Sequence, residues 1–297
     1  MPNLSEELDR RLVSCLSCPV CGQGLRVSED CRSLVCGGAR AHCFDGGGGG
    51  YLPLAPRHPG GGDAREAVRA RSCFLNQGYY DPAREALCKL AAEYLPAGGC
   101  LLDAGCGEGY YSVGLAAAGF SVAGIDLSKF AADAAARRAR AERLRRMPRC
   151  ASHTLFAVGS VFELPLRDAC MDGVVNVFAP CAAAEFARVL KPGGILIVAG
   201  AGEEHLMGLK SLLYDETHVN DARRDLPGGD VPLAFVGRST VSFPVTVEGR
   251  ESIDALFSMT PYYWRTSRDG QSRLAAVNRL ETAVSFDFHV YQKNTGE

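Results

Sequence analysis

Short apolar runs alternate with longer helical stretches along the chain from residue 81 onward. Asp81 and Pro82 favour the start of a helix, and the breakers in 96–99 end it. The compact apolar runs that follow predict buried strands. The predicted strands are 100–103, 121–126, 154–159, 173–179 and 195–201, and the predicted helices between them are 111–118, 129–146 and 182–190. Strands that alternate with helices in this way are typical of a parallel α/β sheet.

The same pattern predicts the remaining elements and divides the chain into parts. After residue 202 a helix is predicted over 205–214, a strand over 240–247, a helix over 251–259 and a last strand over 283–292. Residues 16–54 are rich in cysteine and glycine, and 57–72 change from helix breakers into a helix. We therefore expect a small module in 1–56, a linker and lid in 57–80, and the main domain in 81–297.

The composition is that of a soluble globular protein. Of the 297 residues, 47% are hydrophobic, and no apolar run approaches the roughly 20 residues that a membrane span needs. The polar N-terminus lacks the pattern of a secretory signal, so a cytoplasmic protein is expected. A net charge of -2 argues against a wholly basic surface, yet seven arginines lie in 137–149. That stretch is either a local RNA-binding face or an ordinary solvated helix face.

A glycine-rich loop follows the first predicted strand in "LLDAGCGEGYY". After Asp103, the glycines Gly105, Gly107 and Gly109 let a ligand approach the backbone and allow positive φ angles. A dinucleotide fingerprint reads G-x-G-x-x-G, whereas this loop reads D-x-G-C-G-E-G. The spacing favours S-adenosylmethionine as the ligand. Gly109 can also serve close helix packing.

Two further features lie at the ends of the next predicted strands. Asp126, followed by Leu127, stands 21 residues beyond Gly105, where a carboxylate can accept hydrogen bonds from both ribose hydroxyls. Asp126 can also cap the next helix. Ser160 and Val161 follow the third strand and are expected along the adenine. With "RVLKPGG" before the fifth strand, these features predict a class I (Rossmann-like) S-adenosylmethionine-dependent methyltransferase.

The fourth predicted strand runs into "FAPC", where class I enzymes place the loop on the acceptor side. Pro180 and Cys181 are consistent with a cysteine nucleophile that adds to a pyrimidine, as in C5-methyltransferases. Cys181 can also be a small buried residue at the start of the next helix. A C5-cytosine or small-molecule methyltransferase is therefore an alternative function. The intact glycine loop argues against a second alternative, a zinc-dependent RNA-binding protein with an inactive methyltransferase fold.

Six of the thirteen cysteines lie between Cys15 and Cys43. Cys18 and Cys21 form a C-x2-C pair, and Cys36 follows further along the chain. In a reducing compartment such clustering favours a metal over disulfides, and zinc takes four sulfur or nitrogen ligands in a tetrahedron. A structural zinc site is predicted in the small module, with chance clustering as the alternative. The fourth ligand is open among His42, Cys43, Cys15 and Cys31.

Motifs along nearly the whole chain resemble one family. In order they are "CPVC", "HCFD" with "GYLPL", "ARSCFLNQGYYDP", "LDAGCGEGYY", "FAPCAAAEFARVLKPGG", "EEHLMGLKSLLY" and "MTPYYWR". This set is similar to the RlmA-type 23S ribosomal RNA guanine-N1 methyltransferases, which include macrolide-resistance enzymes of antibiotic-producing actinobacteria. The cysteine pair, the segment at Tyr80 and "MTPYYWR" are specific to that family, whereas the glycine loop is not.

The resemblance implies a reaction and its binding residues. It implies methyl transfer to N1 of a guanine in a hairpin loop of 23S rRNA, with macrolide resistance as a consequence and a homodimer as the assembly. The implied S-adenosylmethionine contacts are Tyr80, Gly107, Glu108 and His205, with Asp126 on the ribose. Tyr80 would fold over the site as a lid, or else pack between linker and core. His205 can alternatively be an ordinary exposed histidine.

The resemblance also implies how the metal and the RNA are held. The family register H-x-F-D favours His42 over Cys43 as the fourth zinc ligand, although five residues separate Cys36 from His42 where the family has three. The zinc module is expected to recognise the RNA hairpin by phosphate contacts together with the arginine stretch. The arginines proposed to contact RNA are Arg137, Arg138, Arg145 and Arg146.

Guanine N1 must lose a proton as it is methylated, and it lies on the Watson-Crick edge. The target must therefore be unpaired or flipped out of a stack. Asn176, near the end of the fourth strand, is a candidate to orient the base. Tyr262, Tyr263 and Trp264, the only tryptophan of the chain, are candidates to stack on it, with an aromatic core as the alternative.

Overall fold

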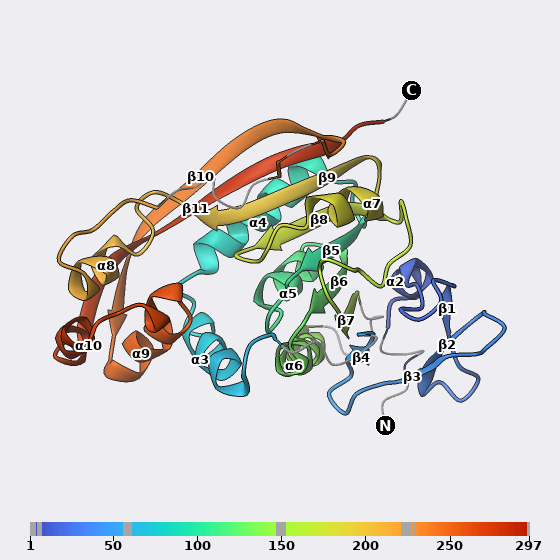
Figure 1. Cartoon of the computed structure of the whole chain (residues 1–297), viewed down its shortest axis with the longest axis horizontal. Helices are drawn as coiled ribbons and strands as arrows, with labels where there is room; N and C mark the ends of the chain where they lie inside the picture. The colour runs from blue at the N-terminus through green and yellow to red at the C-terminus, as the bar shows by residue number, and fades with distance from the viewer. Residues whose placement is uncertain are drawn as a thin grey trace.

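An eight-stranded sheet runs through the centre of the molecule (Figure 1). The structure is a computed structural model that describes residues 4, 8–55, 61–146, 153–220, 227–228 and 230–295. The strand order is β10-β11-β9-β8-β5-β6-β7-β4. Its strands are β4 (Leu52–Pro53), β5 (Cys100–Ala104), β6 (Ser121–Asp126), β7 (Thr154–Val158), β8 (Met171–Val177), β9 (Leu190–Ala201), β10 (Leu233–Glu248) and β11 (Arg279–Lys293). The strands from β4 to β9 pair in parallel, whereas β11 is antiparallel to both β9 and β10. The predicted α/β sheet is confirmed.

The strand residues alternate between two hydrophobic layers. Leu101 packs in the layer with α4 (Asp81–Tyr94) and α5 (Tyr110–Ala117). Its neighbour Leu102 packs in the layer with α2 (Arg10–Cys15) and α7 (Ala183–Val189). Val175 and Val174 of β8 divide in the same way, because successive side chains of a strand point to opposite faces. Both faces are thus buried, as a parallel sheet requires.

The N-terminal segment is built into one face and one edge of the sheet. Leu12 and Leu16 are completely buried in the same cluster as Leu102. Arg11 donates from its guanidinium to the carbonyl of Gly98 at 2.8 Å. Strand β4, which the sequence did not predict, pairs with β7 as the edge strand. The cysteine-rich part adds a separate antiparallel sheet of β1 (Leu25–Val27), β2 (Ser33–Cys36) and β3 (Cys43–Asp45).

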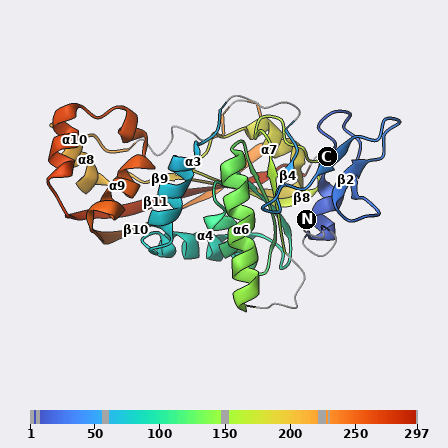
Figure 2. The same cartoon turned by 90° about the horizontal axis from the view of Figure 1, so that it is seen from below.

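A helical lobe stands at the opposite end of the molecule from β1–β3 (Figures 1 and 2). Strands β10 and β11 are longer than the predicted 240–247 and 283–292, and they pair from Leu233 with Lys293 to Glu248 with Arg279. Their length carries the lobe beyond the parallel strands. Helix α10 and the 3-10 turn η1 were not predicted. The lobe consists of α8 (Met207–Leu213), α9 (Arg250–Ser258), η1 (Pro261–Trp264) and α10 (Arg268–Ala275).

Helix α6 (Lys129–Arg146) packs on β6 and β7, and helix α3 (Arg65–Leu75) packs against α6 and α9. Figure 2 shows α3 and α6 running side by side, and the two helices are in contact. Helix α3 confirms the helix expected after the breakers that precede it. Within the part of the chain that the structure describes, no helix is long and apolar enough to cross a membrane.

Leu12→Ala should lower the free energy of unfolding of the whole protein by about 2–5 kcal/mol, because it removes a fully buried side chain from the layer shared with the sheet. Val20→Ala is the control: Val20 is 58% exposed, and its loss should change that free energy by no more than about 0.5 kcal/mol. Urea unfolding followed by circular dichroism gives both values. Equal effects of the two substitutions would show that the N-terminal segment unfolds separately from the sheet.

Candidate active site and zinc cluster

The glycine loop connects β5 to α5 at the carboxyl edge of the sheet. Gly105, Gly107 and Gly109 have φ angles of 76°, 55° and 75°, which disfavour other residues. A Cβ at Gly105 would lie 2.5 Å from the Cβ of Ala179, so a side chain has no room there. The absence of a side chain thus lets the loop pack against the segment after β8, and Gly105 and Gly107 border the groove described below, where a cofactor can reach their backbone. This cradle fits the predicted S-adenosylmethionine.

Asp126 joins this loop to the end of β6. Its Oδ2 accepts from the backbone N–H of Gly107 at 2.9 Å, and its Oδ1 accepts from that of Ser128 at 2.8 Å. Burial raises the pKa of Asp126, while these two hydrogen bonds act in the opposite direction. The side chain also borders the groove described below, next to Leu127. The geometry is therefore compatible both with ribose binding and with the alternative role at the start of α6.

The two other acidic residues of the loop region differ in position. Asp103 is buried under the loop, accepts from Ser112, and does not border the groove. Burial raises the pKa of Asp103 to about 7. Glu108 does border the groove, and it accepts from Nε of Arg71 at 2.5 Å. Burial lowers the pKa of Arg71, but the neighbouring carboxylates of Glu108 and Asp63 raise it more, so the pKa lies above its ordinary value.

Arg71 was not singled out from the sequence, because it lies in the segment read as a linker. It belongs to α3, and a Cβ added at Gly107 would lie 3.1 Å from its guanidinium. Helix α3 thus presses against the cofactor loop. The residues next to Arg71 in the sequence do not predict this contact, because it depends on the packing of α3 against α6.

Tyr80 and His205 meet in an aromatic cluster beside β9. Their side chains approach at 3.4 Å between Oη and Nε2, and both rings contact Phe286 of β11. Tyr80 is buried, so it packs between the α3–α4 segment and the core while it also borders the groove. His205 is buried as well, which excludes the ordinary exposed histidine considered from the sequence.

The hydrogen bonds of His205 determine its charge and tautomer. The backbone N–H of Ser285 donates to Nδ1 at 3.2 Å, so Nδ1 carries no proton. Burial lowers the pKa of His205 to about 4. The ring is therefore neutral at pH 7, with its proton on Nε2 facing the Tyr80 hydroxyl.

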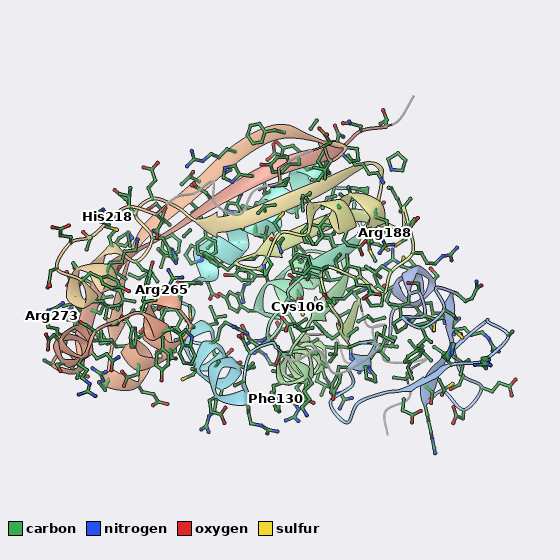
Figure 3. The ribbon with its side chains drawn as sticks, in the orientation of Figure 1. Cys106, Phe130, Arg188, His218, Arg265 and Arg273 are labelled. Atoms are coloured by element: carbon green, nitrogen blue, oxygen red, sulfur yellow. The ribbon has the colours of Figure 1, made fainter. Side chains whose placement is uncertain are left out.

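One large groove, of about 2530 Å³, runs along the carboxyl edge of the sheet and is bounded on the far side by the helical lobe. Ser160 and Val161, which were expected along the adenine, border the groove at its β7 end. Tyr262, Tyr263 and Trp264 border the lobe side, and Trp264 is 84% exposed. Figure 3 shows Arg265 on the side of the lobe toward the sheet, and that residue borders the groove too.

Asn176 lies at the floor of the groove, near the end of β8. It is 1% exposed, and its Nδ2 donates to the carbonyls of Ala104 at 3.0 Å and Pro180 at 3.3 Å. Among the described residues, its Oδ1 is the only buried side-chain nitrogen or oxygen without a hydrogen-bond partner. Such an acceptor costs about 1–3 kcal/mol if nothing donates to it.

The predicted metal ligands converge in the N-terminal module. The ligand atoms of Cys18, Cys21, Cys36 and His42 all lie within 4.8 Å of one another. Nδ1 of His42 is 3.5 Å from the Cys18 sulfur and 3.4 Å from the Cys36 sulfur, and the sulfurs of Cys21 and Cys36 are 3.8 Å apart. Zinc bonds of about 2.3 Å to sulfur and 2.0 Å to nitrogen give tetrahedral edges of about 3.5–3.8 Å. The geometry fits a Cys3His zinc site.

The other candidate ligands lie outside this cluster. The Cys43 thiol is exposed and contacts Asp45, while Cys15 is buried against the sheet. The residues inserted before His42 form the turn between β2 and β3, closed by the hydrogen bond from the Cys36 N–H to the His42 carbonyl. The backbone N–H of Gly38 and contacts to His42 lower the pKa of Cys36 to about 6, which favours the thiolate that a metal requires.

Comparison with known proteins agrees with this geometry. A family model described as "Methyltransferase domain" matches residues 102–198. A 23S rRNA (guanine(748)-N(1))-methyltransferase of Streptomyces fradiae is 35% identical over 289 residues, covering 93% of this chain and 97% of its own. A relative from Micromonospora griseorubida, provisionally named for 23S rRNA guanine-N1 methylation, is 36% identical and covers 91% and 94%.

The chain belongs to the 23S rRNA (guanine-N1)-methyltransferase family.

Family membership confirms the resemblance found in the motifs, and with it a methyltransferase of the class I fold. A further relative from Bacillus subtilis strain 168, with a provisional name for the same methylation, is 28% identical and covers 94% of this chain and 98% of its own. Among solved structures, the YcgJ protein from Bacillus subtilis aligns with 73% of this chain and 100% of its own, at 16% identity and a TM-score of 0.48.

Cys181 does not border the groove of this family member. Its side chain packs against the hydrophobic layer on the α7 side of the sheet, whereas its neighbour Pro180 borders the groove. A nucleophile must reach the base that is methylated. The position therefore gives no support to the C5-cytosine alternative and matches the small packed cysteine that was considered beside it.

The arginines of α6 fall into two groups. Arg137 and Arg145 are largely exposed and form helix-surface ion pairs with Asp133 and Glu142. Arg138 instead donates from Nε to the carbonyl of Glu108 at 3.0 Å, so it braces the glycine loop and does not project with the others. The side chain of Arg146 and the rest of the stretch to 149 lie outside the described residues.

The neutral His205 predicts a specific loss of stability in acid. The ordinary pKa of histidine is 6.5, and the pKa of His205 in the folded protein is about 4. Between these pH values the unfolded chain binds a proton at His205 and the folded chain does not, so the free energy of unfolding falls as the pH is lowered. From pH 6.5 to pH 4 the unmodified protein should lose roughly 3 kcal/mol more than His205→Asn, which cannot titrate. Urea unfolding across this range measures the difference; parallel curves would contradict a buried neutral histidine.

Proposed function

We propose that this protein transfers a methyl group from S-adenosylmethionine to N1 of a guanine in a hairpin loop of 23S ribosomal RNA. The observation that carries the proposal is the match over nearly the full length to relatives named for this reaction, at 35–36% identity. The Streptomyces fradiae relative is named for guanine 748, so this position is the first to examine. We further propose that the protein acts in the cytoplasm, that the modification confers macrolide resistance and that the assembly is a homodimer.

The groove offers room for both reactants. When bound, S-adenosylmethionine supplies a methyl group on a sulfonium that needs no further activation. We propose that Asp126 binds the ribose and that the adenine lies against Leu127, Ser160 and Val161. Tyr80 would bind the amino-acid end, and His205 would hold the Tyr80 hydroxyl in place. The part of the groove between the ribose and the amino-acid end is lined by Gly105, Gly107 and Glu108. Asp103 does not border the groove and would support the loop through its hydrogen bond with Ser112. Alignment at near-attack distance contributes roughly 7–11 kcal/mol in reactions of this kind.

The lobe is proposed to hold the target nucleotide. An unpaired base must leave its stack before N1 becomes accessible, and an exposed aromatic ring can replace the lost stacking. Trp264 and Tyr263 are both exposed and in edge-to-face contact with each other, with ring centres 5.0 Å apart. Their position across the groove from the glycine loop supports this assignment.

We propose that the zinc module in 1–56 positions the RNA. Segment 57–80 would serve as linker and lid to the methyltransferase domain in 81–297. A Cys3His zinc site would fix the β2–β3 hairpin, and Arg137 and Arg145 would add phosphate contacts on α6. Arg146 belongs to the same proposal from its place in the sequence. Arg138 is assigned to the glycine loop instead.

Primer extension on 23S rRNA tests the reaction, because a methyl group on N1 blocks base pairing and stops the polymerase. Cells that produce the protein should show a strong stop next to one guanine, and cells without it should not. Asp126→Ala should weaken the stop at least about tenfold, since the substitution removes the proposed ribose ligand. Glu281→Gln, at an exposed carboxyl of β11 away from the groove, is the control that should leave it unchanged. A stop at a cytosine, or none, would contradict guanine N1 methylation.

Metal analysis of purified protein tests the zinc site with a matched pair of variants. Cys36→Ser should reduce bound zinc from about one ion per chain to a small fraction, because it removes one of four converging ligands. Cys43→Ser should keep the ion, since that thiol lies outside the cluster. Retention of zinc by Cys36→Ser, or its loss from Cys43→Ser, would require a different set of ligands.

A further inference from the structure

The side-chain amide of Asn176 has a fixed orientation. Its Nδ2 faces two backbone carbonyl oxygens, those of Ala104 and Pro180, at 3.0 and 3.3 Å. Rotation of the amide by 180° would place Oδ1 against both carbonyls, and two acceptors repel each other. The amide therefore presents its Oδ1 as an acceptor to whatever lies on the other side. In the described structure nothing donates to that atom.

The strand order indicates which part of a ligand reaches this acceptor. Along the sheet the order is β8-β5-β6-β7. Ser160 and Val161 follow β7, Asp126 ends β6, and the glycine loop follows β5. With the adenine over β7, the ribose at β6 and the sulfur over the glycine loop, the amino-acid end of S-adenosylmethionine must continue toward β8. Asn176 is the buried polar residue of β8 that borders the groove there.

We infer that Oδ1 of Asn176 accepts a hydrogen bond from the α-ammonium group of S-adenosylmethionine. An ammonium donates three hydrogens and accepts none, so it matches an amide oxygen whose orientation cannot reverse. The bond is charge-assisted, and such bonds are shorter and stronger than neutral ones. Asn176 is thereby a cofactor-binding residue, in place of the base-orienting role first considered for it.

The neighbouring hydroxyl of Tyr80 completes the recognition of an amino acid. The backbone N–H of Ser285 donates to Nδ1 of His205, and Nε2 faces the Tyr80 oxygen. If His205 donates there, the Tyr80 proton is left for an acceptor on the ligand, which the α-carboxylate supplies. One acceptor at Asn176 and one donor at Tyr80 thus match the two charged groups of the amino-acid end.

Guanine also carries donors, at N1 and at its exocyclic amino group, but its place in the groove is less suitable. Asn176 is bonded to Ala104, the residue directly before Gly105, and so lies under the cofactor loop. The base must lie beyond the sulfur, toward the lobe. Phe178, which is 49% exposed and has a φ of 50°, follows β8, borders the groove and lies with its ring against that of His205.

The inference rests on S-adenosylmethionine as the donor but not on the identity of the RNA. It is tested by calorimetric binding of S-adenosylhomocysteine and of its analogue without the α-amino group, in the full-length protein without RNA. The unmodified protein should bind the analogue at least about tenfold more weakly. Asn176→Ala should bind the two compounds within about threefold of each other. Asn278→Ala, the same change at an exposed position, should behave as the unmodified protein.

Each outcome decides the inference. Equal binding of the two compounds by the unmodified protein overturns it, as does full discrimination by Asn176→Ala. If that variant does not fold, Asn176→Ser, whose hydroxyl can still donate to a backbone carbonyl but whose shorter side chain removes the amide oxygen, should also bind the two compounds within about threefold of each other; full discrimination there also overturns the inference. An RNA with inosine at the target position lacks the exocyclic amino group of guanine. If that RNA, and not the cofactor analogue without the α-amino group, reproduces the effect of Asn176→Ala, the amide contacts the base and the inference is overturned. Failure of the unmodified protein to bind S-adenosylhomocysteine at all would reject the donor itself, whereas binding without RNA methylation would reject only the proposed target.

Discussion

The hydrogen bond from the Gly107 N–H to the Asp126 carboxylate holds the ends of β5 and β6 in one site. A loop with positive φ angles is stable only where its backbone groups find partners, and here a buried carboxylate supplies one. The loop is then braced from two helices. Arg71 of α3 binds the Glu108 side chain, and Arg138 of α6 binds the Glu108 carbonyl. The position of the cofactor loop thus depends on contacts between parts of the chain that are far apart in sequence.

The groove combines two surfaces of different character. The sheet side is formed by buried side chains, among them Tyr80, Asn176 and the neutral His205. The lobe side presents exposed Trp264 and Tyr263 at the end of two long strands. A reaction between a small cofactor and a base on a large RNA needs both, because the cofactor is enclosed while the nucleic acid must enter from outside. The net charge of -2 is compatible with this, since cationic side chains such as Arg265 are placed locally.

The sequence predicted the parallel strands well because each is a compact apolar run between helices. It did not predict β4, since Leu52–Pro53 is too short to show any periodicity. It underestimated β10, whose side chains are mostly exposed or half-buried and so lack a clear apolar pattern. The cofactor loop was recognised from its glycines, but Arg71 and the bracing role of Arg138 were not, because both depend on packing of α3 and α6. The spacing of the residues left the fourth ligand of the candidate zinc site open, and the family register favoured His42. The β2–β3 turn places the inserted residues so that His42 faces the three cysteines.

In the proposed binding mode the cofactor lies across β7, β6, β5 and β8 in that order, from its adenine to its amino-acid end. A crystal structure of the complex with S-adenosylhomocysteine tests this most directly. We expect the ribose hydroxyls on Asp126, the adenine beside Val161, and the amino-acid end between Asn176 and Tyr80. An adenine found over β8 and β9, or a ligand bound outside the groove, would refute this binding mode.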